Sequence, residues 1–212
     1  MRTFIQAMFA MTLLSAVALA QELPAPAQGS FQVRYAANLA AGDSIINLTN
    51  AGPVQTEADP SPTIDSTDLL GDICANVYVF AEDQQLIACC ACPLTPNHLR
   101  TLSVDNDLIS NTLTPGVPIG VTVALLSTDG SEGSCNPAAP GESIGGLKAW
   151  GTTLHAVPGG GYGVTETAFS PAQLSASEYS KLISYCGFIQ ADGSGYGICK
   201  SCANGAAGAA KQ

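Results

Sequence analysis

The sequence has few basic residues and few charged residues of any kind. Only 7 of its 212 residues are Lys or Arg, against 17 Asp and Glu, and charged residues make up 11% of the chain. Nucleic-acid binding needs a basic surface that neutralises phosphates, so a net charge of −10 excludes that class of partner. Aromatic residues (6%) and histidines (2) are also scarce, which argues against a carbohydrate cleft and against imidazole-based catalysis.

Several catalytic and cofactor motifs are absent or lack their usual setting. The G-x-S-x-G pentapeptide of the serine hydrolases occurs at Gly141-Glu142-Ser143-Ile144-Gly145, but it lies in a loop rich in Gly, Ser and Pro and not on a strand-to-helix turn. Residues 159–163 are rich in glycine, but the Lys and the following helix of a phosphate loop are missing, so this segment predicts a flexible turn. We therefore predict no cofactor and no catalytic residue.

The first 20 residues have the layout of a secretory signal peptide. Arg2 precedes an apolar run from Phe4 to Leu14, and Ala18-Leu19-Ala20 stands before Gln21. We expect cleavage after Ala20 and a mature protein that is secreted or held at the cell surface or in the periplasm. No later run is apolar and long enough to span a bilayer, so the mature chain is expected to have no membrane span.

The mature chain predicts a single β-rich domain over residues 31–202, between a flexible leader (21–30) and a flexible Gly/Ala-rich tail (203–212). Residues 53–72 are rich in Pro, Asp, Ser and Thr without an apolar period, which indicates a long polar loop. Alternating or continuous apolar segments predict strands at 31–35, 44–48, 73–80, 85–92, 120–127 and 147–156. Many short strands favour an antiparallel β-sandwich of the Ig-like kind.

One amphipathic helix is predicted over residues 175–186. Ser175 and Glu178 have the spacing of a capping box, and Tyr179, Leu182 and Cys186 lie on one helical face. Gly187 is placed to end the helix. We expect the apolar face to cover the sheet, with Cys186 reaching a partner cysteine.

The eight cysteines are even in number and follow the export signal, which predicts up to four disulfides as staples. On a strand, Cys90 and Cys92 share one face while Cys89 points to the other, so neighbouring cysteines should have different partners. We also expect Cys74 to pair with a member of this triplet, across the hairpin that they flank. The candidates are Cys74, Cys89, Cys90, Cys92, Cys135, Cys186, Cys199 and Cys202.

Two other uses of the cysteines stay open. Cys199 and Cys202 form a C-x-x-C, which in a thioredoxin-like setting is a redox pair with Lys200 beside it. Soft thiolate and imidazole ligands for a metal are available at Cys89, Cys90, Cys92 and His98, although their spacing matches no familiar zinc pattern.

Four segments carry a resemblance to known proteins: residues 42–52, 73–80, 89–96 and 197–202. Together they resemble a group of uncharacterised exported, cysteine-containing bacterial proteins, over nearly all of the mature chain. This resemblance implies export and brings no activity. The early strand and the Gly42-Asp43-Ser44 turn also resemble the start of Ig-like surface and fibre subunits, which implies an Ig-like fold.

These observations favour a non-catalytic exported protein with a structural or interaction role at the cell surface or in the extracellular matrix. Its sheet edges would pair with a second copy or with another surface protein, and residues 31–39 are the segment we expect to do so by strand addition. An exported thiol-redox or metal-binding protein is the alternative. A secreted hydrolase is the third possibility, with His98 and His155 as its only imidazoles.

Overall fold

The computed structural model describes residues 23–52 and 71–202. The predicted signal peptide (1–20), the predicted tail (203–212) and most of the predicted polar loop (53–72) lie outside the described residues. Residues 23–26 of the leader have no regular secondary structure, and the Ala27 N–H donates a hydrogen bond to the Ser143 hydroxyl at 2.6 Å. Among the described residues, no helix has the length and apolarity needed to cross a membrane.

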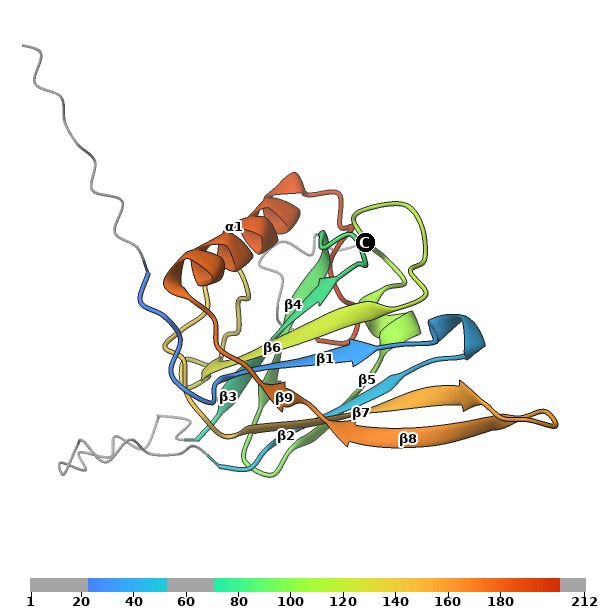
Figure 1. Cartoon of the computed structure of the whole chain (residues 1–212). Helices are drawn as coiled ribbons and strands as arrows, with labels where there is room; N and C mark the ends of the chain where they lie inside the picture. Colours follow the sequence, from blue (N-terminus) through green and yellow to red (C-terminus); the bar gives the residue numbers. More distant parts are fainter. Residues whose placement is uncertain (1–22, 53–70, 203–212) are drawn as a thin grey trace, which may run out of the picture.

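The described part of the chain consists mainly of β-strands, with one α-helix near its end (Figure 1). A short 3₁₀ turn (Leu39–Ala41) follows the first strand and a π-helical turn (Val104–Leu108) follows the fifth. The strands and helix are β1 (Phe31–Ala36), β2 (Ile45–Asn50), β3 (Ile73–Phe80), β4 (Leu86–Leu94), β5 (Leu99–Ser103), β6 (Val121–Asp129), β7 (Leu147–Ala156), β8 (Tyr162–Ala168), β9 (Ser170–Pro171) and α1 (Ala176–Asp192).

The strands form two antiparallel sheets. The larger sheet has the order β4-β3-β6-β1-β9 and the smaller one the order β5-β2-β7-β8. The chain passes from one sheet to the other between β8 and β9, through the buried Phe169. The mainly antiparallel two-sheet architecture agrees with the class predicted from the sequence.

The main hydrophobic core lies between the two sheets. The larger sheet contributes alternate residues of β3 and β6, such as Val77 and Leu125, and the smaller sheet contributes Ile46, Leu48 and Leu102. Alternation of apolar and polar residues explains strands such as β2, which has one face in this core. β3 and β4 are almost entirely apolar because both of their faces are covered, and the buried Asn76 of β3 donates hydrogen bonds to the Leu126 carbonyl and the Thr128 hydroxyl.

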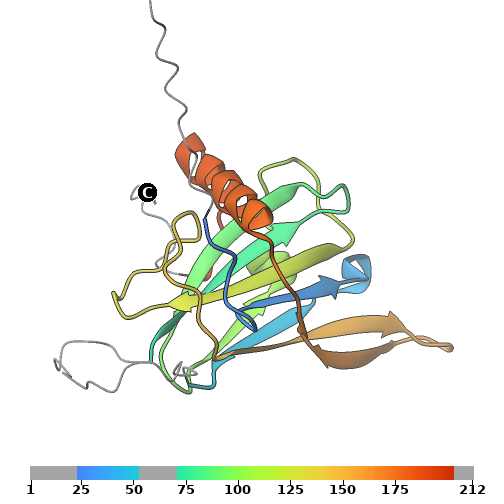
Figure 2. The same cartoon turned by 60° about the vertical axis from the view of Figure 1, so that its left-hand side comes forward.

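Helix α1 covers the outer face of the larger sheet (Figures 1 and 2). Tyr179, Leu182 and Ile189 pack there against a second apolar cluster that includes Tyr78 and Leu126 of the sheet. The predicted capping box is confirmed: the Ser175 hydroxyl accepts from the Glu178 N–H, and the Glu178 carboxylate accepts from the Ser175 N–H.

The predicted end of this helix at Cys186 is wrong. The helix continues through Gly187 to Asp192, because Ile189 extends the buried face by another turn. Gly187 keeps helical geometry, and Gly193 ends the helix instead, in the left-handed conformation (φ 67°) that glycine adopts at low cost.

The remaining sequence predictions place most strands within one to two residues of those observed. β3, β7 and the β3–β4 hairpin lie where the apolar runs predict them. The sequence analysis missed β5, β8 and the two-residue β9, and the first residues of β8 were interpreted as part of a glycine-rich turn. The β7–β8 hairpin extends away from the rest of the molecule in Figure 1, and it becomes important for the functional site.

Candidate functional site

All eight cysteines are joined in four disulfides, and none is free. The prediction that Cys89 and Cys90 have different partners is confirmed. The prediction that Cys74 pairs with the triplet is wrong: its partner is Cys135, in the loop that follows β6, because the side chain of Cys74 faces this loop on the outer side of the sheet. The pairs are Cys74–Cys135, Cys89–Cys186, Cys90–Cys199 and Cys92–Cys202.

Three of these disulfides fasten the last part of the chain to β4. Cys89 holds α1 on the outer face through Cys186, whereas Cys90 and Cys92 hold the C-terminal segment on the core side. Cys199 and Cys202 are therefore not bonded to each other, and both are buried. Each cysteine of the C-x-x-C therefore forms a separate disulfide with β4.

The structure does not bring the four metal-ligand candidates together either. Cys89 lies on the opposite face of β4 from Cys90 and Cys92, and each sulfur is already in a disulfide. His98 is exposed in the turn between β4 and β5. In the described ranges, no group of three or more His, Cys, Asp or Glu side chains is arranged to hold a metal ion.

The two histidines lie far apart. His98 precedes Leu99, which shares a row of the smaller sheet with Lys148 of β7. His155 lies seven residues beyond Lys148, which corresponds to about 23 Å along a strand. Its exposed ring contacts the Thr165 hydroxyl at 2.9 Å. The two imidazoles therefore belong to no common site.

β8 is the outermost strand of the smaller sheet, and among the described strands it pairs with β7 alone. Two bonds in the same register show which residues face β7: the Phe169 N–H donates to the Ala149 carbonyl (2.9 Å), and the Val157 N–H donates to the Gly161 carbonyl (3.3 Å). Backbone groups alternate along an antiparallel strand, so the odd-numbered residues of β8 bond to β7. The N–H and C=O groups that point outward belong to Tyr162, Val164, Glu166 and Ala168, which we call the β8 edge.

Both edges of the larger sheet are protected. Along β4, the Cys89 N–H donates to the Gly197 carbonyl (2.8 Å), and the Ile87 carbonyl accepts from the Leu113 N–H (2.9 Å). At the other side, β9 has only two residues, one of which is Pro171. A covered strand and a short strand with proline are two common ways to prevent edge pairing.

The second edge strand of the smaller sheet is shorter and partly capped. β5 has five residues and carries the positive charge of Arg100. The Ser103 N–H donates to the Asp107 carboxylate at 2.7 Å, which removes a donor from this edge. β8, by contrast, has seven residues, no proline and the single charge of Glu166. Among the described strands, β8 is the least protected edge.

A buried arginine fixes the base of the β7–β8 hairpin. Arg34 of β1 donates to the Thr153 hydroxyl of β7 (2.7 Å) and to the Thr167 hydroxyl of β8 (3.3 Å). A Cβ atom at Gly151 would lie 2.6 Å from its guanidinium carbon, so a larger residue there would displace the guanidinium from these hydrogen bonds. Burial lowers the pKa of Arg34. These contacts join β8 and β7 to β1 at the base of the hairpin.

The outer face of the hairpin carries exposed apolar side chains. Trp150 is 37% exposed, Tyr162 58% and Val164 62%. Trp150 lies opposite Ala168 in the β7–β8 pairing, and Leu154 lies opposite Val164. Exposed apolar side chains next to unpaired backbone groups are the combination that strand addition uses for affinity and specificity.

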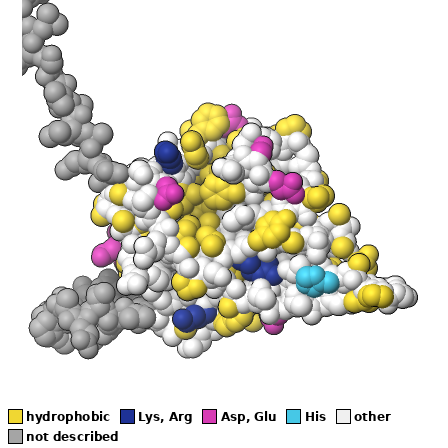
Figure 3. Space-filling view, in the orientation of Figure 1, with side chains coloured by type: hydrophobic (Ala, Val, Ile, Leu, Met, Phe, Trp, Pro, Cys, Tyr) yellow, Lys and Arg dark blue, Asp and Glu magenta, His cyan; other side chains and the backbone are white. Residues whose placement is uncertain are grey.

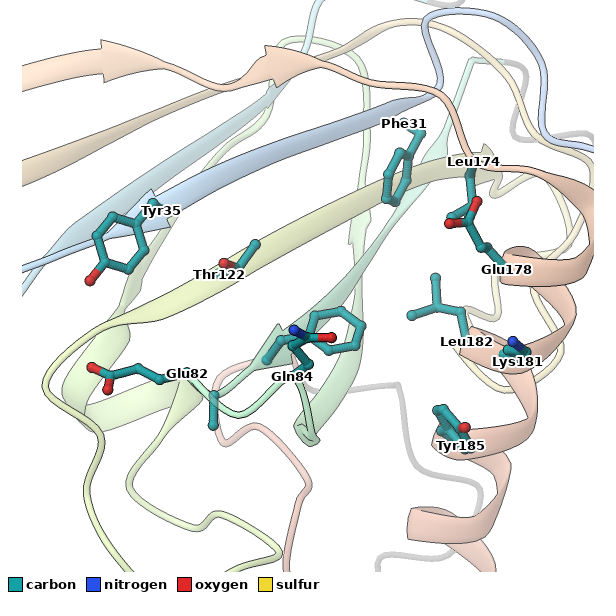
Figure 4. Close-up of a pocket in the computed structure, with 12 residues that line it drawn as sticks. Phe31, Tyr35, Glu82, Gln84, Thr122, Leu174, Glu178, Lys181, Leu182 and Tyr185 are labelled. Atoms are coloured by element: carbon teal, nitrogen blue, oxygen red, sulfur yellow. The ribbon is translucent and has the colours of Figure 1, made fainter.

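A groove of about 710 Å³ lies between α1 and the outer face of the larger sheet. Figure 3 shows hydrophobic side chains gathered on this face, and Figure 4 shows Tyr185 and Leu182 of the helix opposite Tyr35, Thr122 and Glu82. The Glu178 carboxylate already accepts hydrogen bonds from the N–H and the hydroxyl of Ser175 in the helix cap. The groove is open, and its lining combines apolar side chains such as Leu182 with the polar side chains of Glu82, Gln84 and Lys181.

Comparison with protein-family models found no match to this chain, and comparisons with curated proteins and with solved structures found no significant similarity.

Proposed function

We propose that this is a non-catalytic structural protein that works outside the cytoplasm and associates with neighbouring chains by strand addition at the β8 edge. The observation that carries the proposal is the contrast between β8, whose outward backbone groups have no partner strand, and the protected β4 and β9 edges. An exposed strand of this length is a template for another strand.

The β8 edge replaces residues 31–39 as the segment for strand addition. β1 is paired with β6 along all six of its residues, and β9 covers Gln32 and Val33 on the other side. Donating β1 to another chain would break these pairings and the Arg34 contacts. β8 can accept a strand without losing any contact within the chain.

The disulfides support an extracellular role. Four disulfides that close sequence separations of 61 to 110 residues persist in an oxidising compartment and restrict the unfolded chain. They fasten α1 and the C-terminal segment and leave the β7–β8 hairpin free of covalent restraint. We further propose that the two sheets are an Ig-like sandwich, which is the fold implied by the resemblance of residues 42–44 and the preceding strand to surface and fibre subunits.

Val164→Pro tests the proposal. Proline removes the outward N–H of Val164, a group that the β7 ladder does not use, so the fold should persist while the edge is blocked. If each lost backbone hydrogen bond is worth about 1 kcal/mol, the loss of two at one symmetric contact weakens association about tenfold or more. Analytical ultracentrifugation over a concentration series measures this effect.

Val164→Thr is the matched control, because it keeps a β-branched side chain and the edge N–H. It should associate like the wild type, and all three proteins should have the same far-ultraviolet circular dichroism. A wild-type protein that stays monomeric at every concentration, in 0.15 M salt that screens its negative charge, would contradict the proposed function. So would a Val164→Pro protein that associates as strongly as the wild type.

A further inference from the structure

We infer that the partner at the β8 edge is a second copy of this chain, paired antiparallel across a two-fold axis that passes Thr165. This inference rests on the proposed function and deepens it by naming the partner and the register. It predicts a closed pair in which the smaller sheets of two molecules become one continuous sheet.

The backbone restricts the register. The outward groups of β8 belong to even-numbered residues, so an even-numbered residue must face an even-numbered residue of the partner strand. A two-fold axis perpendicular to the sheet meets this condition when it passes through one residue of β8. Thr165 is the middle residue of β8 (Tyr162–Ala168), so an axis there pairs every residue of the β8 edge. An axis at Val164 leaves Ala168 without a strand partner.

The charges favour the same register. With the axis at Thr165, Glu166 faces Val164 of the second copy, and the two Glu166 side chains are not opposite each other. An axis at Glu166 would place these carboxylates in direct cross-strand contact, which is destabilising. The two threonines at position 165 face each other instead, and threonine pairs are favourable across antiparallel strands.

The exposed aromatic side chains also fit a second copy. Tyr162 of one copy would face Ala168 of the other, and Ala168 is already opposite Trp150. The small alanine would thus have an aromatic side chain on either side, on the outer face of the joined sheet. Tyr162 and Trp150, now 58% and 37% exposed, would gain apolar contact with each other across it.

A closed pair is favoured over an open filament. A filament through β8 needs a different edge to accept it, and the remaining strand edge of the smaller sheet, β5, is shorter and capped at Ser103 by Asp107. The projecting hairpin shown in Figure 1 also lets the two bodies lie at opposite ends of the strand pair. In an antiparallel pair, the tip of one hairpin lies beside the base of the other.

Thr165→Cys tests the register. Residues facing each other in a non-hydrogen-bonded pair have Cα atoms about 4.5 Å apart, within the range of a disulfide. Mild oxidation of the folded variant should therefore give a covalent dimer as the main product on a non-reducing gel, and adding Val164→Pro should abolish it. Peptide mapping should show that the four native disulfides remain.

Thr167→Cys is the matched control. Each substitution removes one side-chain hydrogen bond, from His155 in the first case and from Arg34 in the second. In the proposed register the two copies of residue 167 are four residues apart along the strands, about 13 Å, which is too far for a disulfide. Equal cross-linking of both variants would overturn the inference.

The remaining outcomes separate the inference from the proposed function. If the wild type associates through β8, as shown by sensitivity to Val164→Pro, but Thr165→Cys does not cross-link or forms species larger than a dimer, the two-fold register is wrong and the proposed function stands. If the wild type does not associate at all, both fail.

Discussion

At the scale of single residues, Asp105 is a carboxylate in an unfavourable place. Its Oδ1 atom is buried without a hydrogen-bond partner, and burial followed by the nearby Asp43 carboxylate raises its pKa. A carboxyl group with a raised pKa in the folded state contributes stability below its unfolded pKa, and this contribution is lost as the pH rises through the folded pKa. Asp105 therefore destabilises the fold at neutral pH.

Asp105→Asn is expected to raise the melting temperature at pH 7, and the gain should disappear as the pH falls toward 3.5. Differential scanning calorimetry at several pH values measures the melting temperature. For a chain of this size, each kcal/mol of added stability raises the melting temperature by about 2–4 °C. Glu132→Gln removes the same charge from an exposed loop position and should have little effect. A melting temperature for Asp105→Asn that is lower than wild type at pH 7 would show that this account of Asp105 is wrong.

The disulfide partners show which features of the fold the local sequence pattern predicts and which it does not. The alternation along β4 correctly separates Cys89 from Cys90 and Cys92, because side-chain direction is a local property of a strand. The partner of Cys74 depends on where the loop after β6 lies, which no local pattern specifies. Cys135, 61 residues away, was therefore not recognised as its partner.

At the scale of elements, the start of α1 depends on Ser175. The side chain of Ser175, and then its backbone N–H, donate hydrogen bonds to the Glu178 carboxylate and lower the pKa of Glu178. The stability that these bonds contribute is therefore present above the unfolded pKa of Glu178 and is lost as the pH falls through the lowered pKa of the folded state. Ser175→Ala should reduce the free energy of unfolding by about 1 kcal/mol at pH 7, and by less in acid.

Chemical denaturation at the two pH values measures this change. Ser177→Ala is the control: the Ser177 hydroxyl is exposed and lies 3.3 Å from the Ser175 hydroxyl, but the two capping-box hydrogen bonds join Ser175 and Glu178, so this change should be nearly neutral. An equal loss of stability for both variants would mean that the capping box contributes nothing specific.

The elements also show why the candidate site was missed. β2 and β7 are predictable because one face of each is in the core and the apolar residues alternate. β8 is exposed on both faces and follows three glycines, so its Tyr162 and Val164 are too few to stand out from the turn. The β-forming residues Tyr162, Val164 and Thr165, which follow one another closely after the glycines, were the available signal. Whether β8 is an open edge depends on strand order, which local sequence does not determine.

At the scale of the whole molecule, the four disulfides are all attached to the larger sheet, through β3 and β4. Each disulfide joins a strand to a distant segment, so α1, the loop after β6 and the C-terminal segment are all held against the larger sheet. The smaller sheet carries no disulfide and presents the β8 edge. A body with its disulfides on one sheet and an exposed strand edge on the other fits the proposed role of a subunit that joins neighbouring chains.

The most direct test of this account is non-reducing peptide mapping of the purified native protein, together with a count of free thiols under denaturing conditions. The account predicts no free thiol and the pairs Cys74–Cys135, Cys89–Cys186, Cys90–Cys199 and Cys92–Cys202. A disulfide between Cys199 and Cys202, or two or more free thiols, would contradict it and favour thiol chemistry.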